Sequence, residues 1–274
     1  MAQVAGPTRT RSSEALQRRY GKTQRLDRWW LEPALVGGGL IIFIIYTSIS
    51  AFSGDYWVPF EAGVVDGHAT YLSPFFEPLI RVPGMPAWFS PAIWILWAPL
   101  AFRTTCYYYR RSYYRSYFLS PPACAVAEPA TKYTGERDFP LVLQNLHRYA
   151  MYIALLFPPM LFFGAFKAFW LGGDIGGEFG VGLGSIILVI NAFLLTMYTV
   201  GCHSLRHIVA GGLNRFSHTP FRRTRRRLWE LFTVANEQHR LWAWSSLIWV
   251  MLTDLYIRLV ANGNITDPNT WSAF

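Results

Sequence analysis

Charged residues are scarce in this chain, and their scarcity excludes an ordinary soluble domain. Of its 274 residues, only 15% are Asp, Glu, Lys or Arg, whereas 52% are hydrophobic. Soluble domains usually contain about 25% charged residues. The composition therefore predicts an integral membrane protein.

The chain also lacks a secretory signal before its first apolar run, and it has few cysteines. Residues 1–28 are basic and polar, without an apolar core of their own, so we expect the N-terminus to stay in the cytoplasm. The three cysteines, Cys106, Cys124 and Cys202, all fall on the side assigned below to the reducing cytoplasm, so no structural disulfide is expected.

The excess of basic residues does not indicate nucleic acid. The formal net charge is +9, but the Lys and Arg residues cluster beside apolar runs and follow no nucleic-acid-binding motif. Anionic membrane lipid explains this pattern better, most simply for the run RRTRRR at residues 222–227. A docking surface for an acidic cytoplasmic partner is the alternative for that run.

Five apolar runs predict an all-α fold with five transmembrane helices. They cover residues 34–52, 87–109, 141–170, 181–207 and 241–260, and the last is preceded by an amphipathic segment from about Arg227. Pro158 and Pro159 are expected to kink the third helix. The aromatic-rich loop at residues 53–86 is expected to lie along the membrane surface.

The distribution of Lys and Arg orients these helices. Twenty-two of the 25 lie before the first span, between Arg103 and Arg148, or between Arg206 and Arg240. The positive-inside rule places these segments in the cytoplasm and the C-terminus outside, which requires an odd number of spans. We expect a cytoplasmic segment at residues 1–28, a membrane domain at 29–260 and an extracytoplasmic tail at 261–274.

A repeat marks the four predicted inner boundaries. Cys106 and Cys202 end spans two and four, each followed four residues later by an arginine, Arg110 or Arg206, on the same helical face. His147-Arg148 and His239-Arg240 open spans three and five. The interval from Cys to His is 41 residues in one hairpin and 37 in the other.

Spans two to five are therefore predicted to form a four-helix bundle around a cofactor site at the inner boundary, with Cys106, Cys202, His147 and His239 as ligands. Two Cys and two His suit zinc or a Rieske-type iron-sulfur centre, and two facing histidines suit haem b. The spacing of the four residues does not distinguish zinc, a Rieske-type centre and haem b. Cys124 and His218 are interpreted as loop residues. The residues expected to support these ligands from just outside, or to serve as alternative ligands, are His203, Arg110, Arg148 and Arg240.

The boundary motifs LHRYAMY, CHSLRHIVAGG and NEQHRLWAW resemble those of the membrane-anchor subunit of an actinobacterial succinate dehydrogenase, respiratory complex II, and the resemblance covers about residues 29–260. It implies partnership with a flavoprotein that oxidises succinate and an iron-sulfur protein, and reduction of quinone at the cell membrane. Higher oligomers of the complex are left open.

The resemblance also bears on the cofactor. Related five-span anchors generally carry two haems b, each with a histidine toward the outer side. Here the outer histidine is His68, in a loop, so two stacked haems are not expected. Electron transfer needs a redox-active metal, which zinc is not. A Rieske-type [2Fe-2S] centre uses both cysteines, whereas one haem b, the alternative, would leave them unexplained.

Quinone reduction needs hydrogen-bond donors at the depth of this site. The candidates are His207, Arg103, Arg206, Tyr107, Tyr149 and Trp242. Three other functions compete with this interpretation: the haem b anchor of a fumarate reductase or another quinone-linked dehydrogenase, a transporter, and a cofactor-free scaffold.

Overall fold

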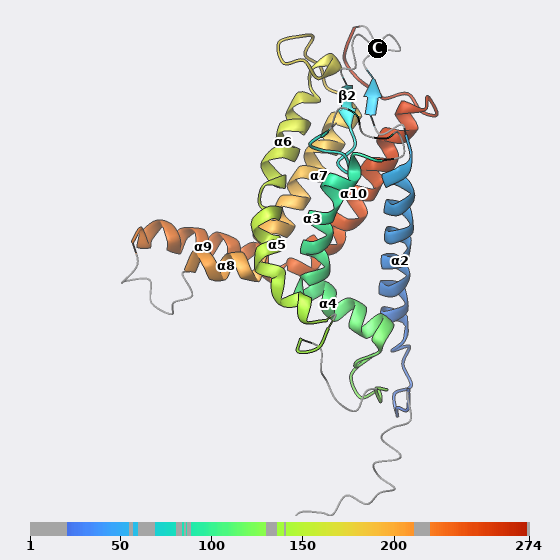
Figure 1. Ribbon diagram of the computed structural model, residues 1–274, viewed down its shortest axis with the longest axis vertical. Helices are drawn as coiled ribbons and strands as arrows, with labels where there is room; N and C mark the ends of the chain where they lie inside the picture. The colour runs from blue at the N-terminus through green and yellow to red at the C-terminus, as the bar shows by residue number, and fades with distance from the viewer. Residues whose placement is uncertain are drawn as a thin grey trace, which may run out of the picture. The chain divides into compact units, whose positions relative to one another are not determined.

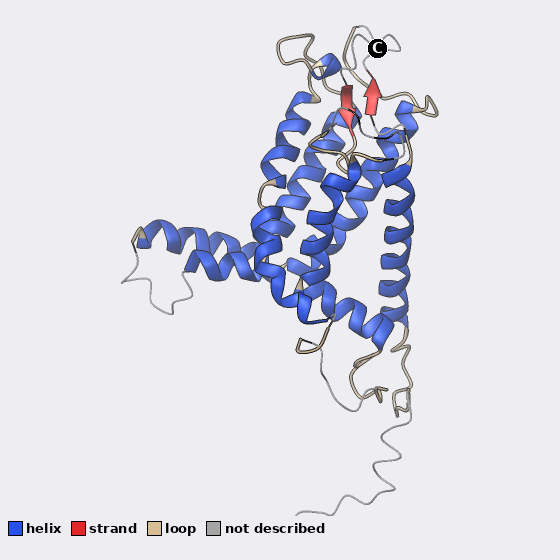
Figure 2. Cartoon of the chain, in the orientation of Figure 1, coloured by secondary structure: helices blue, strands red, loops and turns tan. Residues whose placement is uncertain are grey.

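The chain is predominantly helical in a computed structural model that describes residues 21–54, 57–59, 69–80, 84, 86, 89–129, 136–139, 141–210 and 220–272. Figure 2 shows helix throughout most of this part, with one pair of short strands. The helices are α2 (Leu31–Phe52), α3 (Ala92–Thr105), α4 (Tyr107–Tyr113), α5 (His147–Ala154), α6 (Phe157–Lys167), α7 (Leu183–Val200), α8 (His203–Ala210), α9 (Arg222–Glu237) and α10 (His239–Ala261). The strands β1 (Trp57–Pro59) and β2 (Ala69–Leu72) pair antiparallel. Short helical turns cover Tyr114–Phe118, Leu141–Leu146 and Leu171–Gly173.

Four described segments are long and apolar enough to cross a membrane. They are Leu31–Phe52, Leu141–Lys167, Leu183–Val200 and His239–Ala261, and they correspond to the first, third, fourth and fifth predicted spans. The 22 residues of α2 extend about 33 Å at the usual helical rise, which matches the thickness of a bilayer core. The all-helical membrane fold is therefore confirmed, whereas the count of five spans, their orientation and the four-helix bundle stay predictions.

The second predicted span contains a shorter helix than expected. Helix α3 has 14 residues, about 21 Å, and its first residue, Ala92, packs with Phe75, Phe76 and Val250 in one buried cluster. In the described part of the preceding loop, Phe75 and Phe76 are buried within the protein. Its position along the membrane surface stays a prediction. Non-helical backbone is tolerated at membrane depth where protein surrounds it.

The third span is broken where the prolines predicted a kink. Helix α5 ends at Ala154 and α6 begins at Phe157, with Pro158 and Pro159 in its first turn. Proline lacks a backbone N–H and is tolerated there, because first-turn N–H groups have no partner within the helix.

The fourth span ends earlier than predicted. Helix α7 stops at Val200, Gly201 and Cys202 form the turn, and α8 starts at His203. Figure 1 shows α8 and α9 running across, rather than along, the long helices α6, α7 and α10. His203 and His207 thus belong to this transverse hairpin and not to a span. The amphipathic segment predicted before span five is α9, and Gln238 separates it from α10.

The chain divides into two compact units. The expected division into cytoplasmic, membrane and extracytoplasmic segments stays a prediction. One unit comprises residues 1–42 and 104–145, the other residues 43–103 and 146–274. In the first, the Tyr117 hydroxyl donates to the Gly37 carbonyl at 2.7 Å, which joins α2 to the turn after α4. The expected cytoplasmic segment at residues 1–28 lies mostly outside the described residues.

A buried carboxylate, Asp254 of α10, ties together three elements of the second unit. It accepts hydrogen bonds from Tyr46 of α2 at 2.7 Å, from Ser50 of α2 at 2.9 Å, and from Ser73 in the segment after β2. Arg258, one turn further along α10, forms an ion pair with it at 2.8 Å. Because buried charges are stable only when paired and hydrogen-bonded, this network fixes the packing of α2 on α10.

Candidate functional site

The predicted repeat is present in the local structure of both hairpins. Cys106 lies between α3 and α4, and Cys202 between α7 and α8, each just before a short helix. The carbonyl of Cys106 accepts the first helical bond from Arg110 at 2.8 Å, and that of Cys202 accepts from Arg206 at 3.1 Å. His147 and His239 are the first residues of α5 and α10. The sequence repeat is therefore a repeat of helix starts.

Two of the four predicted ligands touch each other. The Nε2 atom of His147 lies 3.2 Å from the Sγ atom of Cys202, which is 1% exposed. The His147 ring stacks on Phe102 of α3, with ring centroids 5.0 Å apart and an angle of 8° between the planes. This packing fixes the orientation of the imidazole against the thiol.

The second histidine is held in the same way. His239 stacks on Tyr198 of α7 at 5.1 Å, and Tyr198 meets Phe102 edge to face at 5.3 Å. The two imidazoles are therefore joined by one continuous set of ring contacts, each stacked on one ring of the same aromatic pair.

Gly201 provides the space for His239. A side chain at position 201 would place its Cβ 3.1 Å from Nδ1 of His239 and 3.0 Å from the carbonyl oxygen of Ala235. The Gly201 carbonyl also accepts a hydrogen bond from Asn236 at 2.7 Å. Since Gly201 precedes Cys202, His239 lies against the same turn that carries the thiol.

Arg103 places a positive charge beside these stacked rings. It is 8% exposed, its guanidinium lies 4.6 Å from the centre of the Tyr198 ring, and it donates to Ser246 at 3.0 Å and to the Ala243 carbonyl at 3.4 Å. In a medium of low dielectric constant, such a charge stabilises negative charge on a neighbouring group more strongly than in water.

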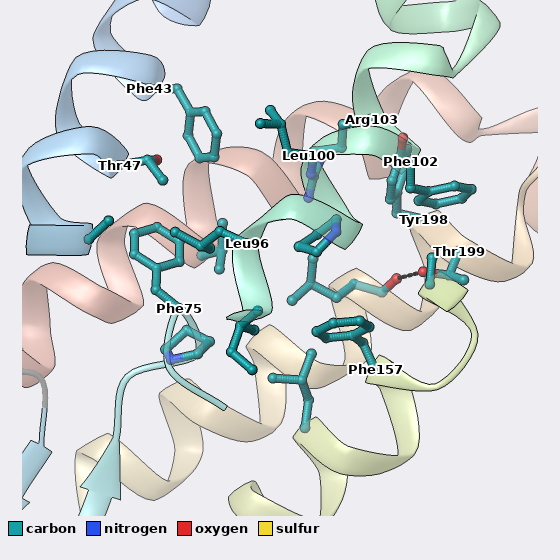
Figure 3. A pocket seen from close by; sticks show the side chains of 18 of the residues that line it. Phe43, Thr47, Phe75, Leu96, Leu100, Phe102, Arg103, Phe157, Tyr198 and Thr199 are labelled. Atoms are coloured by element: carbon teal, nitrogen blue, oxygen red, sulfur yellow. Dashed lines mark hydrogen bonds between the residues drawn. The ribbon is translucent and has the colours of Figure 1, made fainter. Parts of the chain in front are cut away.

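An apolar cavity of about 270 Å³ adjoins the aromatic pair. Figure 3 shows Phe102, Arg103, Tyr198 and Thr199 toward one end of the cavity, and Phe43, Thr47 and Phe75 toward the other. Cavities near this size accept small molecules, and a few polar groups in an apolar lining fix their orientation.

The remaining predicted ligand, Cys106, is 4% exposed and belongs to the first compact unit. Among the described residues, no group of three or more His, Cys, Asp and Glu side chains is arranged to hold a metal ion. His218 lies outside the described residues, and Cys124 is exposed.

The other predicted site residues are described by their own contacts. Arg206 donates to Thr233 at 2.8 Å and covers the Trp229 ring at 4.6 Å, so it packs α8 on α9. Trp242 meets Phe193 edge to face, and its indole N–H has no hydrogen-bond partner in the described part of the chain. Arg110 pairs with Glu136. The exposed members of the set are Tyr107, Tyr149, Arg148, Arg240, His203 and His207.

Four residues that sequence analysis did not select complete the arrangement: Phe102, Tyr198, Gly201 and Ser246. With aromatic residues making up 17% of the chain, Phe102 and Tyr198 were indistinguishable from ordinary packing residues. Gly201 could have been found, because glycine next to a candidate ligand often marks a close approach of the backbone.

Comparison with known proteins identifies the family. Residues 31–263 match the family described as actinobacterial succinate dehydrogenase subunit SdhC. The chain is similar to a chain of the Mycobacterium smegmatis Sdh1 complex in the apo form, with 43% sequence identity, a TM-score of 0.77 and coverage of 91% of this chain and 94% of that one. No curated protein sequence matches. The family match spans most of the chain, which therefore belongs to the actinobacterial succinate dehydrogenase subunit SdhC family.

Proposed function

We propose that this subunit anchors the flavoprotein and iron-sulfur subunits of a succinate dehydrogenase at the cell membrane and passes their electrons to quinone near the cytoplasmic face. Cys106, Cys202, His147 and His239 hold a Rieske-type [2Fe-2S] centre, which supplies one-electron transfer when bound. The observation that carries the proposal is the contact between His147 and Cys202, with His239 against the adjacent Gly201.

The donor set suits such a centre. Rieske-type centres take two thiolates at one iron and two imidazoles at the other. His147 and His239 supply two imidazoles, each stacked on one ring of the same aromatic pair. Cys202 supplies a buried thiol beside His147. Phe102 and Tyr198 orient both rings and exclude water. Cys106, which has the same helix-start geometry as Cys202, is the fourth ligand in this proposal.

The cavity supports a quinone site next to these ligands. Its apolar wall suits a ring with a hydrocarbon tail, and Arg103 offers guanidinium N–H groups to a quinone carbonyl. Reduction to the quinol takes two electrons and two protons. The positive charge of Arg103 stabilises the negative charge that develops on the oxygen. His203 and His207, exposed on α8, are available for proton exchange at the inner side.

Electron paramagnetic resonance of the purified, reduced complex tests the cofactor. We expect a Rieske-type signal that disappears in Cys202→Ser, together with the loss of two iron atoms per complex. Cys124→Ser is the matched control, because Cys124 is exposed and lies outside the proposed ligand set; it should retain signal and iron. A b-type haem spectrum without a Rieske signal would show the cofactor assignment to be wrong.

The quinone site has a separate test. Leu100 lines the cavity, and Leu100→Trp should fill part of it and lower succinate-dependent quinone reduction at least several-fold. Electron transfer from succinate to a soluble dye should be unchanged, because the flavoprotein is not altered. Ile93→Trp, on the same helix but outside the cavity lining, is the control. Unchanged quinone reduction in Leu100→Trp would remove the cavity from the proposal.

A further inference from the structure

The transverse hairpin of α8 and α9 is built by contacts that use only some of its arginines. Arg206 of α8 donates to Thr233 and covers Trp229 of α9. Arg225 of α9 donates to the carbonyls of Val209 and Ile208, at 2.8 and 3.2 Å, and so caps the end of α8. The two helices therefore form one packed element, and these arginines face inward.

The opposite side of α9 presents an apolar stripe. Leu228, Leu231 and Val234 are 39%, 63% and 64% exposed, and their spacing of three residues puts them along one side of the helix. They are separated from the side formed by Trp229 and Thr233, which packs on α8. A helix with one apolar face and one strongly basic end is the type that lies in the plane of a membrane interface.

Three arginines at the start of α9 remain unpaired within the described part of the chain. Arg226 pairs with Glu230 at 2.9 Å and Arg225 caps α8, whereas Arg222, Arg223 and Arg227 are exposed and have no hydrogen-bond or ion-pair partner there. The first turn of α9 contains no acidic residue. Positive charges at the positive end of the helix dipole repel it, and so do like charges four residues apart, such as Arg223 and Arg227.

An anion at this end removes both unfavourable interactions. Arg223, Arg227 and Leu231 follow one another at four-residue intervals, so charge and apolar surface adjoin on one side of the helix. Anionic phospholipids carry the complementary charge on their headgroups, and their acyl chains accept the apolar side chains of the stripe. We propose that the α8–α9 hairpin is an interfacial element that binds anionic phospholipid, with Arg222, Arg223 and Arg227 at the phosphates and Leu228, Leu231 and Val234 inserted below them.

Lipid binding by the whole complex tests the charge side of this proposal. Phosphatidylglycerol is titrated into the delipidated, detergent-solubilised complex and its binding followed by native mass spectrometry. Each arginine at a membrane surface contributes about fivefold, so replacing Arg222, Arg223 and Arg227 with Gln should weaken binding roughly 100-fold. The control replaces three other exposed arginines of the predicted inner side, Arg28, Arg111 and Arg137, with Gln. Equal loss in both variants, or no loss in either, overturns the proposal.

Insertion of the leucines is tested by spin labelling in nanodiscs that contain phosphatidylglycerol. A label on Leu231→Cys, in a Cys124→Ser background, should be relaxed strongly by oxygen and weakly by a water-soluble nickel chelate. A label on Glu237→Cys, about a third of a turn away on the exposed polar side, should show the reverse. A Leu231 label shielded from both agents would mean that a protein subunit covers the stripe, and one relaxed mainly by nickel would mean that water does; either result overturns the proposal.

Discussion

At the scale of single residues, the two histidines of the candidate site are positioned by aromatic rings from neighbouring helices. Phe102 comes from α3 and Tyr198 from α7, while the histidines begin α5 and α10. Four helix segments therefore fix two imidazoles. Rotating either ring would disturb a stacked pair, so the nitrogen atoms keep one direction.

Gly201→Ala should disturb this arrangement. The added Cβ would lie 2.9 Å from the carbonyl oxygen of Met197, 3.0 Å from that of Ala235 in α9 and 3.1 Å from Nδ1 of His239. The turn must therefore move, and the histidine or the end of α9 must give way with it. Overpacking of this kind costs about 1–3 kcal/mol. We expect a lower melting temperature of the complex and an altered Rieske-type spectrum.

The control for this change is Gly38→Ala. Position 38 lies within α2, and a Cβ there has nothing within 4 Å. Replacing a helical glycine by alanine stabilises by up to about 1 kcal/mol, so the melting temperature should not fall. If both variants behave alike, the close approach at Gly201 does not position His239.

How well the sequence predicts single residues of the site depends on the type of residue. Cys and His are few, so a repeated Cys-then-His order stands out, and both histidines do begin helices. Phe102 and Tyr198 are members of an abundant class, and their value comes from ring contacts between helices far apart in the chain. No local pattern contains that information.

At the scale of elements, α3 shows why apolar length alone misjudges a span. Its predicted run of residues 87–109 contains a helix of 14 residues. The segment after β2 packs against the start of this helix and against α10. Ser73 from that segment binds Asp254, as do Tyr46 and Ser50 of α2. Hydropathy records the apolar character of the residues and not which backbone fills the space.

The Asp254 network should contribute strongly to stability. Removing one partner of a buried ion pair costs about 3–5 kcal/mol, since the other charge stays buried. Asp254 is 0% and Arg258 11% exposed, so Asp254→Ala should lower the free energy of unfolding in mixed micelles by about that amount. Asp138→Ala, at an exposed position, should change it by less than about 0.5 kcal/mol.

A double-mutant cycle separates pairing from packing. Arg258→Met removes the buried cation, so the double variant Asp254→Ala, Arg258→Met should be more stable than the sum of the two single changes predicts, by on the order of 0.5–3 kcal/mol. Strict additivity would mean that the two charges do not stabilise one another.

At the scale of the whole molecule, the predicted topology depends on α3 crossing the membrane. The described residues contain four segments long and apolar enough to cross a membrane, and the positive-inside rule predicts an odd number of crossings. Helix α3, extended by the buried segment before it, is the remaining candidate. Cys124 reports on this directly: it is exposed and follows α3 in the chain, whereas Cys106 and Cys202 are buried.

A membrane-impermeant maleimide should label Cys124 in inverted vesicles and not in intact spheroplasts, because five spans put this loop in the cytoplasm. A permeant maleimide, which should label it in both, is the control for access. Asn264→Cys in a Cys124→Ser background should give the opposite pattern, since exposed Asn264 follows the last span. If α3 did not cross, the chain would still be outside after α2, and Cys124 would be labelled in spheroplasts. Such labelling would also move Cys106 away from the inner boundary and so remove it from the proposed ligand set.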